Sequence, residues 1–357
     1  MTLPEPRADL GLRPGYHSAQ VEVKVRLNTN ESPLPPPEGW VDELTEALRR
    51  IAYNRYPDRQ ATALRRALAD LHGVGPDQVF AANGSNEVLQ SLCLAYGGAG
   101  RHALTFEPTY ALHGHISHLT GTGVIEAGRR PDFTIDADDA TALIAQHHPA
   151  LTFLCSPNNP TGLAEDRSTV ERIVAAGTGL TVVDEAYGQF ARWSAIEALA
   201  PDVPLVVTRT FSKTWSMAGV RLGYALGPAP VIRMLERVAL PYHLDALKLA
   251  AGTLALGHVA EMEERVALLV SERERMIGAL AALPVTTWKS EANFVLLRPD
   301  TRSGRDVWQG LVDRSVLVRD TSSWPGLVGS LRVTVGTPTE NDRFLAALSD
   351  VLSGVHA

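Results

Sequence analysis

The chain has 357 residues, of which 45% are hydrophobic, and at about 150 residues per domain this length predicts two domains with a sizeable core. The formal net charge is −7 and no block of Lys and Arg stands out, which argues against a nucleic-acid or membrane-surface partner and favours a small molecule. The N-terminus has no apolar signal core, and the two cysteines, Cys93 and Cys155, are too few for a disulfide framework. We therefore expect a cytoplasmic protein.

Residues 1–40 are rich in proline and lack periodicity, so we expect an N-terminal arm that lies over other structure. A helix is expected over residues 41–52, where apolar side chains share one face, and another over residues 61–72. Strands and helices then alternate, as a doubly wound α/β sheet requires. The expected strands are 79–82, 103–106, 123–125, 151–155, 180–184, 205–208 and 221–226, and the expected helices are 83–96, one that starts at Pro108, and 166–176.

The character of the chain changes after residue 231. A long helical region is expected from residue 244 to 283, and short strands and helices alternate from there onward. The expected strands are 294–297, 316–319 and 331–335, and the expected helices are 305–313 and 340–352. We therefore predict a large domain over residues 41–235 and a smaller α+β domain over residues 236–357.

One lysine, Lys213, falls in the loop that leaves the expected strand 205–208. Open α/β sheets bind their ligands at the carboxyl ends of strands, and a lysine shielded from water there can attack a carbonyl carbon to form a Schiff base. A lone lysine is more often a solvated surface residue. Here Thr210, Ser212 and Arg221 add two hydroxyls and a guanidinium, which suit a dianionic phosphate. The stretch therefore predicts a phosphorylated aldehyde cofactor.

Polar residues also follow other expected strands. Gly84, Ser85 and Asn86 open a helix, whose free N–H groups form either a second phosphate cradle or an ordinary helix cap. Asp184 ends a buried strand, where a carboxylate needs a cation or donor such as a protonated pyridine nitrogen, although an N-cap or a salt bridge also satisfies it. Tyr187 can donate to an oxygen of the same ring or simply pack.

In the stretch from Ser156 to Gly162, two prolines constrain the backbone and present Asn159 at a strand end. Together these motifs resemble the fold-type-I pyridoxal-phosphate aminotransferases over essentially the whole chain. The resemblance implies an α/β fold, with a mostly parallel sheet sandwiched by helices in a large domain. It also implies that Lys213 binds pyridoxal 5′-phosphate covalently and that Asp184 keeps the pyridine nitrogen protonated.

The same resemblance assigns further residues to the cofactor. It implies that Asn159 and Tyr187 flank the ring hydroxyl and that Tyr110 stacks on the ring. It implies a homodimer, in which one phosphate ligand comes from the partner subunit. The implied phosphate ligands are Gly84, Ser85, Asn86, Thr210, Ser212 and Arg221, joined by Tyr56 of the neighbouring subunit.

Within this family the chain is most similar to the histidinol-phosphate aminotransferases, in the stretches 12–16, 27–33, 54–58, 240–244 and 331–337. This similarity implies transamination between histidinol phosphate and 2-oxoglutarate. Arg332 takes the position of the arginine that grips the substrate carboxylate, and we expect it to grip the substrate phosphate as well. Tyr16, Asn30 and Arg319 are the other expected substrate ligands, with a salt bridge to Asp320 or Asp313 as the alternative for Arg319.

Several alternatives stay open at this point. A decarboxylase that acts on an amino-acid phosphate, or an aromatic amino-acid aminotransferase, would use the same cofactor residues. Gly15 is an insertion relative to the subfamily pattern, and Trp215 and Trp324 are expected to add bulk near the site, so all three can alter specificity. The spacing of His113, His115 and His118 does not fit one helix face, so no metal site is predicted and all three are interpreted as ordinary helix and loop residues.

Overall fold

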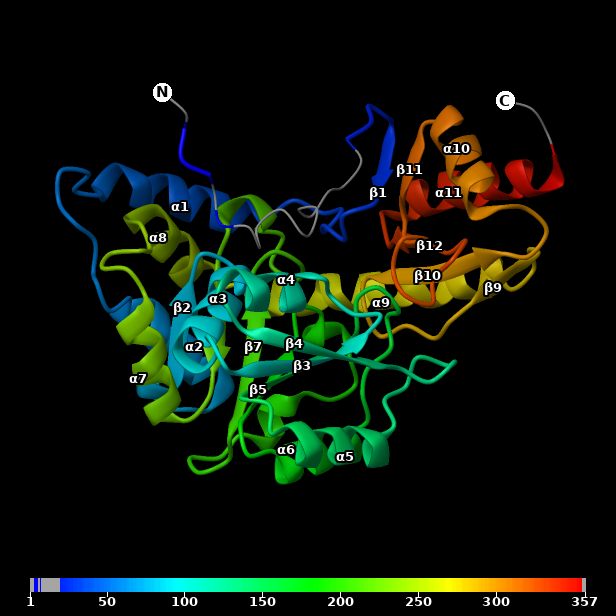
Figure 1. Ribbon diagram of the computed structural model, residues 1–357. Coiled ribbons are helices and arrows are strands. Elements are labelled where there is room, and N and C mark those ends of the chain that lie inside the picture. Colours follow the sequence, from blue (N-terminus) through cyan, green and yellow to red (C-terminus); the bar gives the residue numbers. More distant parts are fainter. Residues whose placement is uncertain (1–2, 6, 8–19, 355–357) are drawn as a thin grey trace.

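The computed structural model describes residues 3–5, 7 and 20–354, and its strands form two sheets that lie side by side (Figure 1). The larger sheet has seven strands in the order β2-β8-β7-β6-β5-β3-β4. Its strands are parallel except for β8, which runs antiparallel to both of its neighbours. The strands are β2 (Val79–Ala82), β3 (His102–Glu107), β4 (Gly123–Gly128), β5 (Leu151–Cys155), β6 (Leu180–Asp184), β7 (Leu205–Thr210) and β8 (Gly223–Leu226).

Helices cover both faces of the larger sheet. One face packs against α3 (Ser85–Tyr96), α4 (Leu112–Leu119) and α7 (Ala229–Val238), and the other against α5 (Ala137–His147) and α6 (Arg167–Ala176). Strands covered on both faces are mostly apolar, and every residue of β5 and β6 is buried. A polar residue at the end of such a strand is therefore conspicuous, as Asp184 is.

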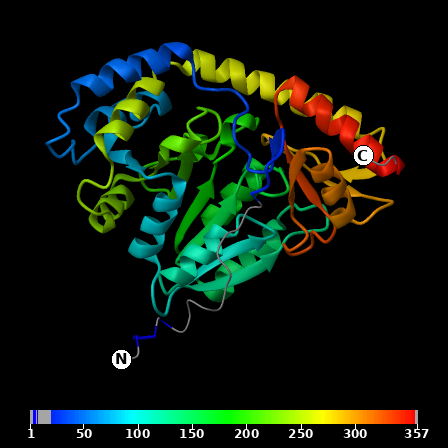
Figure 2. The same cartoon turned by 90° about the horizontal axis from the view of Figure 1, so that it is seen from above.

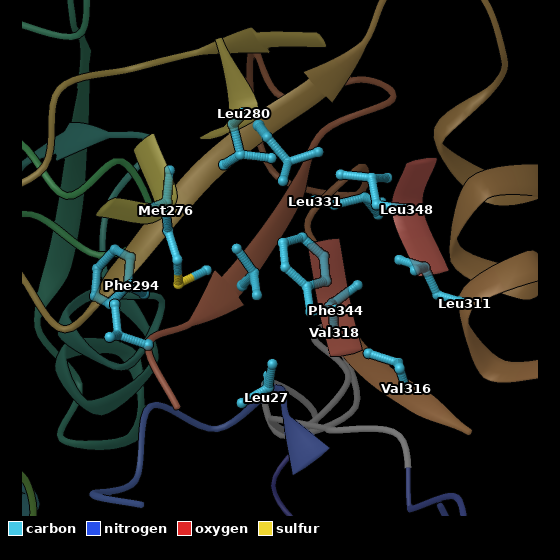
Figure 3. Close-up of a cluster of buried hydrophobic side chains, with 14 of the residues drawn as sticks. Leu27, Met276, Leu280, Phe294, Leu311, Val316, Val318, Leu331, Phe344 and Leu348 are labelled. Atoms are coloured by element: carbon cyan, nitrogen blue, oxygen red, sulfur yellow. The ribbon is translucent and has the colours of Figure 1, made fainter. Parts of the chain in front are cut away.

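The smaller sheet has five strands in the order β1-β11-β12-β10-β9. Its strands are β1 (Val25–Leu27), β9 (Val285–Thr287), β10 (Phe294–Pro299), β11 (Val316–Asp320) and β12 (Leu331–Thr334), and it carries α10 (Gly304–Asp313) and α11 (Pro338–Ser353). Phe294, Leu331, Phe344 and Leu348 belong to the apolar cluster between this sheet and its helices (Figure 3). The predicted arm thus supplies an edge strand, because β1 pairs in parallel with β11.

Four more helices connect the sheets or cover them. They are α1 (Glu38–Arg50), α2 (Thr62–His72), α8 (Ala246–Ala255) and α9 (Val259–Leu280). Helix α9 links the two halves, because Met262 packs with α2 and α8 whereas Met276 and Leu280 pack in the core of the smaller sheet. Figure 2 shows α9 running toward the smaller sheet alongside α11. Among the described helices, none is both long and apolar enough to span a membrane.

The predicted α/β class is confirmed, and the predicted bounds of strands β2, β5 and β6 are the observed ones. The predicted helix start at Pro108 is wrong: α4 begins at Leu112, because the Pro108 carbonyl accepts a hydrogen bond from the Asn158 side chain at 3.0 Å. The expected helical region 244–283 is two helices, α8 and α9, separated at Gly257. Elements β1, β9, α5 and α7 were not predicted. The bounds of the two domains, residues 41–235 and 236–357, stay a prediction.

Candidate active site

A cavity of about 330 Å³ opens at the carboxyl ends of β5, β6 and β7, the edge at which open α/β sheets bind their ligands. Both sheets contribute to its wall, because Asp184 ends β6 and Arg332 lies on β12. Most of the predicted site residues meet in this cavity. Those that line it are Asn30, Ser85, Asn86, Tyr110, Asn159, Asp184, Tyr187, Thr210, Ser212, Lys213, Arg221 and Arg332.

Among the described residues, three predicted site residues do not line the cavity. Gly84 lies behind the wall, next to Arg221. Tyr56 is 80% exposed and stacks on Tyr242, with ring centroids 4.5 Å apart. Arg319 holds its guanidinium 5.9 Å from the centre of the Trp324 ring. Tyr16 lies outside the described residues, as does the stretch 12–16 that contains Gly15.

Lys213 has the environment of a reactive amine. Its Nζ donates a hydrogen bond to the Thr29 carbonyl at 3.0 Å. Burial lowers the pKa of Lys213 to about 7; the nearby Arg332 and Arg221 act in the same direction and Glu31 opposes them. About half of the amine is therefore neutral at pH 7, and only the neutral amine can act as a nucleophile or accept a proton.

Asp184 is 1% exposed and is held by three donors. Its Oδ1 accepts from the Ala186 N–H at 3.1 Å and from the Thr208 hydroxyl at 3.2 Å, and its Oδ2 lies 3.0 Å from His113 Nε2. His113 Nδ1 has no hydrogen-bond partner among the described residues, so Nε2 is the ring nitrogen that donates to Asp184. The ring of His113 stacks on Phe153, with centroids 5.0 Å apart, which fixes its orientation.

Donors for an anion gather where α3 begins. Ser85 and Asn86 form its first turn, whose N–H groups and helix dipole favour negative charge. Arg221 Nη1 lies 3.3 Å from Ser212 Oγ, which accepts the Thr210 hydroxyl at 3.0 Å. A Cβ atom on Gly84 would come within 2.9 Å of Arg221 Nη2, and Gly84 has φ +79°, so the close approach of the guanidinium requires glycine.

A second set of polar groups joins the two sheets across the cavity. Arg332 is 2% exposed and donates to Asn159 Oδ1 and, at 2.8 Å, to the Asn28 carbonyl. The Asn30 amide donates to the Tyr187 hydroxyl at 2.9 Å, so Asn30 positions that ring as well as lining the cavity. The arm thereby contributes to a site that the larger sheet builds.

The expectation of bulk near the site is wrong for Trp215, whereas the ring of Trp324 lies 5.9 Å from the guanidinium of Arg319, an expected substrate ligand. Trp215 is 4% exposed and packs on Phe211, in the cluster with α2 and α8. Trp324 packs near Leu327 in a separate cluster. Neither tryptophan lines the cavity, because Trp215 packs among the residues of α2 and α8 and Trp324 packs in the separate cluster with Leu327.

Several residues with a place in the site were missed, and among them is Thr29, which accepts the Lys213 hydrogen bond. His113, interpreted as an ordinary helix residue, contacts Asp184, and Glu31 and Cys155 line the cavity. Cys155 ends a predicted strand, so its position was a usable signal. His113 carried no such signal, because its contact with Asp184 depends on how α4 packs on the sheet.

Comparisons with known proteins agree with this geometry. The sequence pattern of the family Aminotransferase class I and II matches residues 22–348. The histidinol-phosphate aminotransferase of Frankia casuarinae is 46% identical over 359 residues, which cover 96% of this chain and 89% of that protein. The histidinol-phosphate aminotransferase of Thermobifida fusca is also 46% identical, with 96% and 94% covered.

The fold agrees with a solved structure. The histidinol-phosphate aminotransferase from Sinorhizobium meliloti, in complex with pyridoxal-5′-phosphate, has a TM-score of 0.85 at 23% identity and covers 94% of this chain and 92% of that one. The likeness extends over both sheets. Fold, cavity and sequence thus point the same way, and the chain belongs to the class I and II aminotransferases, on the branch formed by the histidinol-phosphate aminotransferases.

Proposed function

We propose that this aminotransferase moves the amino group of L-histidinol phosphate to 2-oxoglutarate, giving imidazole-acetol phosphate and glutamate in histidine biosynthesis. The observation that carries the proposal is a pair of arginines, Arg221 and Arg332, that enter one cavity from the two sheets and both lower the pKa of Lys213. One guanidinium suits the phosphate of a cofactor, and the other suits the anionic end of a substrate.

The cofactor of this family is pyridoxal 5′-phosphate, and the residues of the cavity fit it. Ser85, Asn86 and the hydroxyls of Thr210 and Ser212 would hold its phosphate together with Arg221. Because Gly84 has no side chain, that guanidinium has room to lie beside it. When bound, the cofactor supplies an electron sink for the bond that breaks at the substrate Cα.

The chain's own side chains would hold and tune the ring. Asp184, fixed by His113, would hold a proton on the ring nitrogen, because a buried carboxylate needs a cationic donor. Asn159 and Tyr187 would donate to the ring hydroxyl, and Tyr110 would stack on the ring. Tyr110 lines the cavity next to His113, with an edge contact of 5.5 Å between ring centroids.

Lys213 would hold the cofactor and would also move the proton. A pKa of about 7 makes its amine basic enough to take a proton from the substrate Cα and acidic enough to release it at C4′. Its bond to the Thr29 carbonyl ties the amine to the arm, which therefore helps to aim it.

Arg332 would grip the carboxylate of glutamate in one half-reaction and the phosphate of histidinol phosphate in the other. Arg319 lies directly opposite Arg332 on the neighbouring strand, so both side chains leave the same face of the smaller sheet. We propose that Arg319, with Tyr16 and Asn30, adds donors for the larger dianionic phosphate.

We also propose a homodimer in the cytoplasm. Tyr56 is exposed here, and the resemblance assigns it to the neighbouring subunit's phosphate site. Tyr56 stacks on Tyr242, and the apolar residues Leu240 and Leu247, which are close to Tyr242 in sequence, are 75% and 45% exposed. A second subunit that packs on this part of the chain would cover them. The thiols of Cys93 and Cys155 are free and buried, which suits a reducing compartment.

The proposal is tested by kinetics with histidinol phosphate and 2-oxoglutarate. Arg332→Ala should lower kcat/KM for glutamate and for histidinol phosphate, whereas Arg319→Ala should lower it mainly for the phosphate substrate, by about 1.5–3 kcal/mol per lost charge-assisted bond, or roughly 10- to 150-fold. Histidinol without its phosphate should react far more slowly. Equal rates for histidinol and its phosphate, faster turnover of phenylalanine, or release of carbon dioxide from an amino-acid phosphate would contradict the proposal.

A further inference from the structure

A second, much smaller cavity lies behind the loop that carries Lys213. Thr214, Trp215 and Met217 of that loop form one part of its wall. The rest of the wall is formed by Pro37, Trp40, Ala255, His258, Met262 and Arg265. The centre of a water-sized sphere can move within a volume of about 10 Å³ in this cavity. This volume is close to the smallest that holds one water molecule. None of these residues lines the cavity of the proposed active site.

Two polar atoms in this wall lack a hydrogen-bond partner among the described residues. They are the Thr214 hydroxyl and the indole Nε1–H of Trp215, and the two side chains are 2% and 4% exposed as whole residues. The other indole in the wall differs, because Trp40 Nε1–H donates to the Ala251 carbonyl at 3.0 Å. An unpaired buried donor is costly, and most buried polar groups have a partner in the protein or in ordered water.

We propose that the cavity holds one ordered water molecule, which accepts the Trp215 Nε1–H and bonds the Thr214 hydroxyl. An indole N–H can only donate and a hydroxyl can do both, so a single water satisfies the two atoms at once. The site exists only because consecutive residues of the lysine loop both turn toward the same gap between helices.

The water has a structural consequence for the lysine. Thr214 and Trp215 follow Lys213 directly, and the facing wall includes Met262 near the start of α9, the helix that connects the two sheets. The bonded water therefore joins the side chains of two consecutive residues of the lysine loop and fixes their relative orientation. Thr214 and Trp215 would act as positioning residues through the backbone of that loop, because neither side chain lines the cavity of the proposed active site.

A crystal structure of the cofactor-loaded protein tests the site directly. We expect a density peak of water strength within about 3.2 Å of both Thr214 Oγ1 and Trp215 Nε1. Arg265 also lines the gap, so crystals grown in bromide provide the control for an anion. An anomalous bromide peak in the gap, or no peak between the two atoms, would overturn the proposal.

Thermal unfolding of variants gives a second test, because the proposal and a dry cavity predict opposite changes in Tm. Thr214→Val keeps the shape of the side chain and removes its hydroxyl. If the hydroxyl binds water, the variant should lower the Tm, whereas in a dry cavity loss of an unpaired group should raise it. The loss should also be coupled to Trp215→Phe, because either change releases the same water, so the double variant should unfold at nearly the same Tm as Trp215→Phe alone.

Trp40→Phe is the matched control for the second change. It shortens an indole in the same wall, but its N–H is bonded to the protein. Combined with Thr214→Val, it should lower the Tm by the sum of the two single effects. A higher Tm for Thr214→Val, or additive effects with Trp215→Phe, would show that the two atoms share no water.

Discussion

At the scale of single residues, the chemistry depends on groups whose surroundings change their properties. Lys213 is the main example, because burial lowers its pKa from the ordinary value of 10.5 to about 7. Two arginines assist this shift and Glu31 opposes it. The same side chain on the surface would be protonated at every physiological pH, so the cavity makes the lysine reactive.

The pKa of Lys213 predicts how fast the cofactor-free protein binds pyridoxal phosphate at different pH values. The amine is protonated below pH 7 and neutral above it, so the rate of covalent binding should rise through pH 7 and level off near pH 8. Borohydride trapping and peptide mapping measure the rate and locate the label. Glu31→Gln should move the midpoint to lower pH, because Glu31 raises the pKa. A midpoint near pH 10, or a label on another lysine, would contradict the assignment.

His113 predicts a graded effect on turnover through Asp184. Asp184→Asn should bind cofactor but lose orders of magnitude in kcat, since an unprotonated ring is a poor electron sink. His113→Leu removes one donor to the carboxylate. It should raise the activation free energy by about 1.5–3 kcal/mol, which lowers kcat roughly 10- to 150-fold. His113→Gln keeps a donor and should recover part of the loss, and it should move the pH dependence of the cofactor absorbance less than His113→Leu does. Equal losses for both variants would show that His113 only fills space.

At the scale of elements, a buried ion pair holds the strand ends that carry the site. Glu185 directly follows Asp184, and Arg209 directly precedes Thr210. The side chains of Glu185 and Arg209 are 3% and 6% exposed. Arg209 donates to Glu185 Oε2 through Nε at 2.9 Å and through Nη2 at 2.6 Å. Because side chains alternate along a strand, this pair lies on the face opposite to Asp184 and Thr210. It fixes the ends of β6 and β7 without contacting the cavity.

Removal of one partner of this pair should therefore be costly. Arg209→Met leaves Glu185 buried and unpaired, and it should lower the free energy of unfolding by about 3–5 kcal/mol in urea titrations. The double change Arg209→Met with Glu185→Leu removes both charges and should recover much of the loss. Arg172→Ala is the control, because its pair with Asp138 is 51% and 85% exposed and should matter little. An Arg209→Met protein as stable as the parent would refute the argument.

At the scale of the whole molecule, the proposed homodimer would complete each active site with a residue of the partner subunit. Tyr56 is exposed and does not line the cavity of its own chain, and its proposed role places it at a neighbour's phosphate site. Complementation tests this arrangement, because a mixed dimer of Lys213→Ala and Tyr56→Phe subunits contains one site free of both changes. Random mixing should restore about a quarter of the parent activity, since half of the dimers are mixed and half of their sites are intact.

Tyr53→Phe supplies the control for this experiment. Its hydroxyl donates to the carbonyl of Leu48, in α1 of the same chain, at 2.9 Å, so that variant should stay active by itself. Activity of the mixture no higher than the sum of the separate variants, or full activity in a monomer, would show that the site is not shared.

The sequence by itself determined the α/β class, the central strands and most of the site. Strands covered on both faces read as apolar runs, so β5 and β6 and the polar residues at their ends were visible without coordinates. Lys213, Asp184 and Asn159 were found for that reason, and a shared strand edge predicted that they would meet. Other predicted site residues, such as Tyr56 and Tyr110, came only from the resemblance to a known family, because no local pattern in the sequence indicates them.

The tertiary structure alone decided the contacts between distant segments. The bond from His113 to Asp184, the pairing of β1 with β11 and the bond from Asn30 to Tyr187 join residues that local periodicity does not connect. It also moved Trp215 out of the site and into the helix packing, because a loop's side-chain directions depend on what surrounds it. Local pattern determines where strands lie and end, whereas the side chains that face each other there depend on how helices pack over the sheet.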